Sequence, residues 1–411
     1  MATRYSNPSG NAGNWGDTST WSATQGGSVG ASVPGTSDLA IVDSGDNVTL
    51  TASVATGSIK VDGTLTGAGY KITLNDGGDA KIANLDGTIS GNLDIEVNSS
   101  TGTNRILDLT STGTVRNLTI NSAGETFTLD ADTTIGSVLT ITAGTLDTNS
   151  STNRSLTVTG DVDVVGTLTC NASACEFGGI YFLGTWNATS GTTEIKLEHS
   201  IGRAVRNNGG TFAHNSGTIL LSRSGDQAFE PHGETYNNIT TSGSGDKEHR
   251  GGTWDINGTL TVGSGTTVSN QTSSQLIDLA GDASVSGTLD LSAGSNHSLG
   301  SLTILSGGTY SATSGTTTLT GKNGGGYSIQ VTGTFTHNKG KVKIDFNTGN
   351  TNDGTSAIWD EMYDYEVDMN STGYGVTNYD KSNATMVVLN NLTVTQGKFK
   401  FGTAGDALTV H

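Results

Sequence analysis

Short runs in which apolar and polar residues alternate recur along the whole 411-residue chain. Residues 155–169, SLTVTGDVDVVGTLT, are typical. Leu and Val alternate with polar residues, and each run ends near a glycine. A period of two is characteristic of half-buried strands, and β-branched residues favour strands over helices. Because no stretch keeps the period of a helix, the pattern predicts an all-β protein with many short strands.

Part of the chain is duplicated. Residues 117–145 match residues 238–266 without a gap, so that Asn117 corresponds to Asn238. Further along, GTWNATSGTTEIKL at 184–197 matches GTYSATSGTTTLTG at 308–321. Residues 117–237 therefore form a module that is repeated, and a third copy begins at NNLTV, residues 390–394.

A shorter period lies inside each module. The sequence Gly-Thr-apolar recurs, often 18 to 29 residues apart, at Gly63, Gly87, Gly144, Gly166, Gly184, Gly210, Gly258, Gly287, Gly308 and Gly333. A coil of three short strands and their turns needs roughly 20–26 residues. We therefore expect a right-handed parallel β-helix, or β-solenoid, with glycines at tight corners. Since aromatic residues are only 6% of the chain, we also expect a core too thin for large rings.

The repeats divide the chain into segments. We predict an N-terminal cap or attachment segment (1–50), first solenoid turns (51–116), module 1 (117–237), module 2 (238–390) and the start of a further turn (391–411). Asn117, Asn238 and Asn391 precede apolar residues at equivalent places, which favours amide ladders or turn contacts at a corner. Gly166 and Gly287 are the corresponding structural glycines of the two modules.

The first 50 residues do not repeat, and they contain Trp15 and Trp21. An open solenoid end exposes its core and unpaired strand edges, so large apolar residues there are expected to form a cap. Attachment to a partner is the alternative role for this pair.

Module 2 contains an insertion at about 348–386. Gly217 and Asn238 are 21 residues apart, whereas their counterparts Gly340 and Asn391 are 51 apart. Aromatic and Met side chains on an outgrowth are typical of contact surfaces, but an inserted subdomain could equally form a small core of its own. The candidate contact residues are Trp359, Met362, Tyr363, Tyr365, Tyr374 and Tyr379.

The net charge of −18 is spread along the chain and opposes binding to nucleic acid or to anionic lipid heads. No run is long enough to enter a membrane, and the N-terminus lacks the apolar core of a secretory signal. We therefore expect synthesis in a cytosol, with Cys170 and Cys175 reduced rather than joined by a short-loop disulfide.

Catalytic patterns are weak. The densest group of carboxylates is Asp360, Glu361, Asp364, Glu366 and Asp368, which alternate with Tyr and Val as in a solvated strand. The sequence contains no phosphate loop, dinucleotide fingerprint or metal-ligand spacing. We predict no enzyme activity, no cofactor and no metal.

The opening residues WSATQGGSVGASVP (21–34) and IVDSGDNVTLT (41–51) resemble the start of β-helical bacteriophage virion proteins. GTFTHNKGKVKID (333–345) and NNLTV are similar to the repeats of such proteins. The resemblance implies a tail fibre or tailspike-like appendage, assembled in the host cytoplasm and located in the virion. It carries over no catalytic residue.

The first hypothesis is thus a structural virion protein: a rigid spacer that adheres to a host surface or to neighbouring subunits. The expected partners are other copies of the chain, commonly as a trimer in tail fibres, other virion proteins and a host-surface glycan. The alternatives are a bacterial or archaeal cell-surface adhesin or extracellular filament subunit, and, at lower rank, a polysaccharide-degrading β-helix enzyme.

Overall fold

The structure is a computed structural model that describes residues 2–75, 80–100, 104–346, 354–357, 361–369, 375–378, 385–401 and 407–411. The chain divides into two compact units. Unit 1 comprises Met1–Thr193, His199–Ile201 and Asn207–Asn215, and unit 2 comprises Glu194–Glu198, Gly202–Arg206 and Ser216–His411.

Unit 1 contains short strands and, among its described residues, two single-turn 3-10 helices. Its elements are β1 (Thr3–Ser6), η1 (Ser9–Asn11), β2 (Ala12–Asn14), η2 (Thr18–Thr20), β3 (Trp21–Ser22), β4 (Leu39–Val42), β5 (Asn47–Thr49), β6 (Val54–Thr56), β7 (Ser58–Val61), β8 (Thr64–Thr66), β9 (Lys71–Leu74), β10 (Lys81–Leu85), β11 (Thr88–Ser90), β12 (Asp94–Val97), β13 (Arg105–Asp108), β14 (Asn117–Leu129), β15 (Thr133–Ile135), β16 (Leu139–Asp147), β17 (Leu156–Val164), β18 (Thr167–Thr169), β19 (Cys175–Phe182), β20 (Thr185–Asn187) and β23 (Thr211–Ala213). Two strands, β21 (Thr192–Ile195) and β22 (Val205–Asn207), contain residues of both units.

The described part of unit 2 is built from strands and turns. Its strands are β24 (Thr218–Leu221), β25 (Gln227–Glu230), β26 (Thr235–Tyr236), β27 (Asn238–Thr241), β28 (Gly245–His249), β29 (Thr253–Ile256), β30 (Leu260–Val262), β31 (Thr266–Asn270), β32 (Leu276–Val285), β33 (Thr288–Asp290), β34 (Asn296–Ile304), β35 (Thr309–Ser311), β36 (Thr316–Leu319), β37 (Ile329–Val331), β38 (Thr334–Thr336), β39 (Lys341–Asp345), β40 (Gly354–Ala357), β41 (Glu361–Asp368), β42 (Gly375–Asn378), β43 (Thr385–Gln396), β44 (Lys398–Phe401) and β45 (Ala407–Val410).

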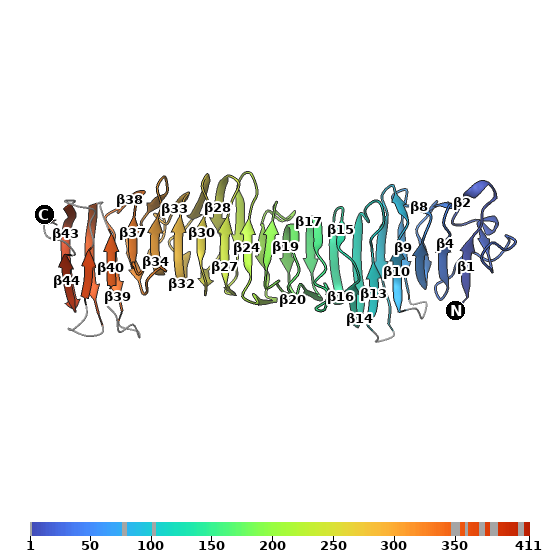
Figure 1. The fold of residues 1–411 in the computed structure, drawn as a ribbon, viewed down its shortest axis with the longest axis horizontal. Helices are drawn as coiled ribbons and strands as arrows, with labels where there is room; N and C mark the ends of the chain where they lie inside the picture. The colour runs from blue at the N-terminus through green and yellow to red at the C-terminus, as the bar shows by residue number, and fades with distance from the viewer. Residues whose placement is uncertain are drawn as a thin grey trace. The chain divides into compact units, whose positions relative to one another are not determined.

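Successive turns of unit 1 pair in parallel and in register. Figure 1 shows β14, β16 and β17 lying side by side. β14 pairs with β16, and β16 pairs with β17. One column of paired, buried residues, with spacings of 18 to 23, is Ile72, Ile95, Leu118, Leu139, Val162 and Ile180. Inward-facing side chains of this kind stack into a continuous apolar core.

Unit 2 repeats the arrangement. Its corresponding column, with spacings of 19 to 27, is Ile219, Ile239, Leu260, Ala283, Leu302 and Ile329, all buried. The predicted parallel β-solenoid is therefore confirmed within each unit, and the predicted turn length of 20–26 residues lies close to the observed spacings.

The expectation of a core too thin for large rings is wrong. Trp186 in unit 1 and Trp254 in unit 2 are fully buried. The indole of Trp186 fits because it packs against rings from its own and the next turn, with centroids 5.6 Å from Phe182 and 5.0 Å from Phe212. Offset and edge-to-face ring contacts of this kind add to the stability gained by burial.

The recurring Gly-Thr pair has a steric cause. A Cβ on Gly184 would lie 2.1 Å from the carbonyl oxygen of Gly166, and one on Gly166 would lie 2.5 Å from that of Gly144. The Gly166 oxygen instead accepts a hydrogen bond of 2.9 Å from the backbone N–H of Thr185. Gly287 is equally constrained, because a Cβ there would lie 2.2 Å from the oxygen of Gly263.

Replacing Gly184 by alanine is expected to lower the free energy of unfolding of unit 1 by about 1–3 kcal/mol, because the backbone of two turns must move apart. Gly191→Ala is the matched control, since the nearest atom to its added Cβ is 3.5 Å away. Urea denaturation followed by far-ultraviolet circular dichroism measures both. Equal stability of the two variants would contradict this explanation of the repeat.

The asparagine pair of the duplicated module makes the same contact in both copies. The side-chain oxygen of Asn117 accepts a hydrogen bond from the backbone N–H of Val138 at 3.1 Å. That of Asn238 accepts one from Thr259 at 2.9 Å. Both donors lie 21 residues later, in the following turn, so each asparagine joins two consecutive turns.

The described part of the predicted insertion continues the solenoid. β40 pairs in parallel with β37 and β42, and β41 pairs in parallel with β39 and β43. The prediction of a separate subdomain in this segment is therefore corrected for the described residues. The segment is about 30 residues longer than its counterpart in module 1, which is close to the length of one turn, and its described strands extend the ladder.

Candidate functional site

The N-terminal segment of unit 1 has a core of two tryptophans. Trp15 and Trp21 are 1% and 0% exposed, and their rings meet edge to face with centroids 4.9 Å apart. The indole N–H of Trp21 donates to the backbone oxygen of Trp15 at 2.7 Å. The backbone N–H of Trp15 donates to Thr49 of β5 at 2.9 Å, which joins this segment to the first turns. Both rings thus lie inside the fold, where a cap requires them.

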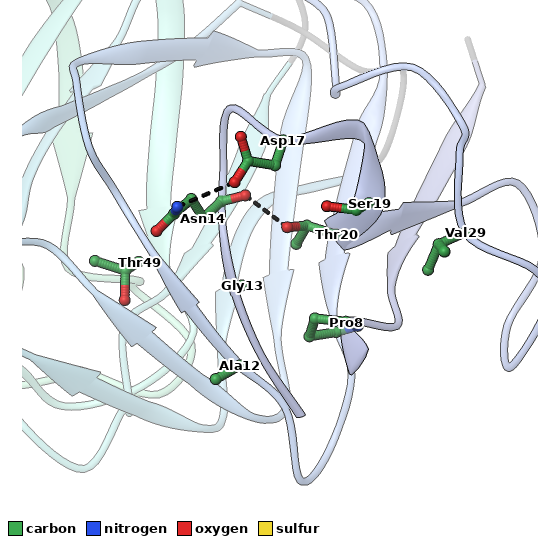
Figure 2. A pocket seen from close by; sticks show the side chains of 9 residues that line it. All are labelled: Pro8, Ala12, Gly13, Asn14, Asp17, Ser19, Thr20, Val29 and Thr49. Carbon is green, nitrogen blue, oxygen red and sulfur yellow. Dashed lines mark hydrogen bonds between the residues drawn. The ribbon is translucent and has the colours of Figure 1, made fainter. Parts of the chain in front are cut away.

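An open pocket of about 400 Å³ lies in the same N-terminal segment as this tryptophan pair, and Figure 2 shows the residues that line it. The polar side chains that line it include Asn14, Asp17, Ser19 and Thr49. Its apolar lining includes Val29, which is 44% exposed. Pockets of this size with a few convergent polar groups are the usual sites of small-ligand binding.

Close contacts fix the shape of the pocket. A Cβ on Gly13 would lie 2.5 Å from the hydroxyl oxygen of Thr20 and 2.9 Å from Cβ of Pro8, so only glycine allows β2 to approach so closely. The Thr20 hydroxyl donates to the backbone oxygen of Asn14 at 2.7 Å (Figure 2). The 3-10 turn that contains Thr20 is therefore held against β2.

One side of the pocket contains a hydrogen-bonded amide and carboxylate. The amide nitrogen of Asn14 donates to one carboxylate oxygen of Asp17 at 3.0 Å (Figure 2). Within the part of the chain that the structure describes, the other carboxylate oxygen of Asp17 and the hydroxyls of Ser19 and Thr49 make no hydrogen bond. These polar atoms are available to a ligand.

The sequence interpretation missed this pocket. Its residues come from β2, η2, β5, the chain before η1 and before η2, and the chain after β3, so they are scattered between Pro8 and Thr49. The available signal was a non-repeating segment rich in Asn, Ser, Thr and Asp, but that composition does not specify which side chains meet.

A second hollow of unit 1, of about 440 Å³, follows the glycine corner. Its floor includes Gly144, Gly166 and Gly184, and Val165 beside it is 53% exposed. A row of outward threonines from paired strands lines it: Thr126, Thr145, Thr167 and Thr185. The hollow is a consequence of the tight glycine corner.

The predicted contact residues of the insertion do not share one surface. Met362 and Tyr365 are completely buried, so they are core residues and cannot form the contact surface that we predicted. Tyr363 is half-buried, and its ring stacks on His337 with centroids 5.7 Å apart. The remaining three, Trp359, Tyr374 and Tyr379, lie outside the described residues.

The carboxylates of β41 pair with neighbouring turns. Glu366 accepts from Lys341 at 2.7 Å, and Asp368 lies 2.9 Å from the ammonium nitrogen of Lys343. Hydrogen bonds from Lys343 to Asp345 and Asp368 raise the pKa of this lysine. Partly exposed pairs of this kind contribute little individually, but they align adjacent turns.

The third repeat asparagine also bonds between turns. The amide of Asn391 donates to the carboxylate of Asp364 at 3.0 Å, as the amide of Asn117 donates to Asp94 at 2.9 Å. Asn391 therefore also joins two turns, although it lies within β43 and not at the end of a strand.

Cys170 and Cys175 are both buried and unbridged. A hydrogen bond with Cys170, together with burial, raises the pKa of the Cys175 thiol far above its ordinary value. Because the thiolate is the reactive form, the raised pKa and the burial of Cys175 disfavour its reaction.

Among the described residues, no helix has the length and apolarity needed to cross a membrane. The same residues contain no cluster of three or more His, Cys, Asp or Glu side chains that could hold a metal ion. Comparisons of the chain with models of known protein families, with curated proteins and with solved structures found no match.

Proposed function

We propose that the protein is a structural and adhesive component of a bacteriophage virion, in a tail fibre or tailspike-like appendage. The observation that carries this proposal is the in-register parallel ladder of each unit, in which buried columns continue from turn to turn. In such a ladder each inner turn is hydrogen-bonded on both sides, so the backbone resists bending and local opening. A spacer needs this property.

The surface suits a particle that must remain soluble at high local concentration. The net charge of −18 opposes association of copies through their strand edges. The proposed partners are other copies of the chain, other virion proteins and a glycan of the host surface. The similarity of the opening residues and the repeats to β-helical virion proteins supports the same assignment.

Purification of virus particles, followed by mass spectrometry and imaging, tests the proposal directly. Particles released from the source cells are purified on a density gradient, and peptides of this protein are sought in the particle band by mass spectrometry. We expect the protein in that band, with gold-labelled antibody located on an appendage; an antibody against the major capsid protein is the control. Absence from the particles, with the protein found in the cell envelope, would contradict the proposal and favour a cell-surface adhesin.

A further inference from the structure

We propose that the pocket of the N-terminal segment binds a neutral saccharide. The inference rests on the proposed adhesive function and names the class of ligand for it. It is carried by three properties of the pocket: its uncommitted polar atoms, its apolar wall and its charge.

The first property is the set of polar atoms. A sugar presents hydroxyl groups that both donate and accept hydrogen bonds around the edge of its ring. The free carboxylate oxygen of Asp17 accepts strongly, while the hydroxyls of Ser19 and Thr49 can donate or accept. Asp17 and Ser19 lie at η2 and Thr49 lies in β5, and all three border one cavity, so a single small polyol can contact several of them.

The second property is the apolar wall. Pro8, Ala12 and Val29 line the same pocket, and Val29 is 44% exposed. The C–H face of a sugar ring is apolar, and covering exposed aliphatic surface with it is favourable. A pocket for an inorganic ion or a small charged group would not need this wall.

The third property is charge. Asp17 is the only charged side chain in the described lining, and the whole protein has a net charge of −18. An acidic sugar would meet a like charge, and the described lining of the pocket contains no cationic side chain to pair with it. One partly solvated carboxylate also attracts a cationic ligand only weakly. A neutral sugar therefore fits the lining best.

The pocket is also formed in advance. The buried tryptophan pair supports the strand and turns around it, and Gly13, Pro8 and Thr20 are in contact. The Asn14–Asp17 hydrogen bond orients the carboxylate before any ligand arrives. A site that needs little ordering on binding retains more of its interaction energy as affinity.

Saturation-transfer NMR and titration calorimetry on the full chain test the proposal. The probes are the methyl glycosides of glucose, galactose, mannose and N-acetylglucosamine, with N-acetylneuraminic acid and glucosamine as anionic and cationic comparisons. We expect at least one neutral glycoside to bind, and Asp17→Ala to weaken binding by about tenfold or more through loss of a charged acceptor. Ala12→Phe, which fills the pocket without removing a side-chain hydrogen bond, should abolish binding.

The controls are Asp86→Ala, at an exposed carboxylate elsewhere in unit 1, and Thr167→Val, in the hollow along the glycine corner. Both should bind as the wild type does. Binding of no neutral glycoside, or neutral-glycoside binding that persists in Ala12→Phe, would overturn the proposal. A preference for glucosamine that is lost in Asp17→Asn would assign the pocket to cations instead. Virions that contain the protein but bind none of the sugars would refute this inference alone, whereas sugar binding by a protein absent from virions would refute the proposed function alone.

Discussion

Replacing Trp21 by alanine is expected to destabilise unit 1 by about 3–5 kcal/mol, the usual cost of removing a buried tryptophan. The side chain is 0% exposed, contacts the ring of Trp15 and donates a buried hydrogen bond of 2.7 Å. Its loss would leave a cavity in the core of the N-terminal segment. Urea denaturation followed by far-ultraviolet circular dichroism gives the change in free energy.

This substitution separates the two roles that the sequence left open for the tryptophans. If the pair is the core of a cap, Trp21→Phe should recover much of the stability, and Val165→Ala, at a side chain that is 53% exposed, should change little. If the pair instead contacted a partner, Trp21→Ala would keep the unfolding midpoint and lose only attachment. That second outcome would contradict the buried placement of both rings.

The repeating part of the fold was predictable because its constraint is local and recurs. Gly166 and Gly184 must lack a Cβ for two turns to approach, so glycine returns once per turn and marks the turn length in the sequence. The alternation of apolar and polar residues within each strand then indicates which side chains face the core. Together these two patterns specify a parallel solenoid without further information.

The error over the insertion has a different origin. Aromatic and Met side chains fill cores as readily as they form contact surfaces, so their composition alone does not decide between the two. Register decides: Tyr365 pairs with Val342 and Val367 with Ile344, both of which face inward. The alternation of Tyr365 and Val367 with charged neighbours was visible in the sequence, but we interpreted it as a solvated strand; a strand with one face in the core has the same alternation.

The pocket of the N-terminal segment could not be predicted at all. Its shape depends on how two 3-10 turns and β2 meet. Irregular backbone of this kind leaves no periodic pattern of apolar residues in the sequence. Asn14 and Asp17 are close in sequence, but Thr49 reaches them only because β5 pairs with β2. The chemistry of the site therefore follows from the cap's irregular path, while the solenoid provides its support.

Two buried histidines are expected to make unit 2 sensitive to mild acid. His249 and His297 are 0% and 3% exposed, and burial lowers their pKa values to about 3 and about 4. His249 packs on the ring of Trp254, and Nδ1 of His297 accepts a hydrogen bond from Ile277 at 3.0 Å, which requires that nitrogen to be unprotonated. Well above pH 6.5 both histidines are neutral in the folded and unfolded states, so the pKa difference does not change stability there.

As the pH falls below 6.5, the unfolded chain takes up protons on both histidines while the folded chain does not, until the pH approaches about 4. Linkage then lowers the free energy of unfolding by about 2 kcal/mol per histidine at pH 5. Asp246, whose pKa burial raises, acts in the opposite direction, because the folded state takes up its proton first.

The urea midpoint of unit 2 should therefore fall markedly between pH 7.5 and pH 5, a range in which ordinary carboxylates remain largely ionised. The double variant His249→Phe and His297→Gln should lose most of this pH dependence, since Phe suits the contact with Trp254 and the Gln side-chain oxygen can accept the hydrogen bond from Ile277. His232→Asn, at an exposed histidine, should behave as the wild type does. An undiminished acid effect in the double variant would assign it to the carboxylates, and the buried histidines would then have no part in it.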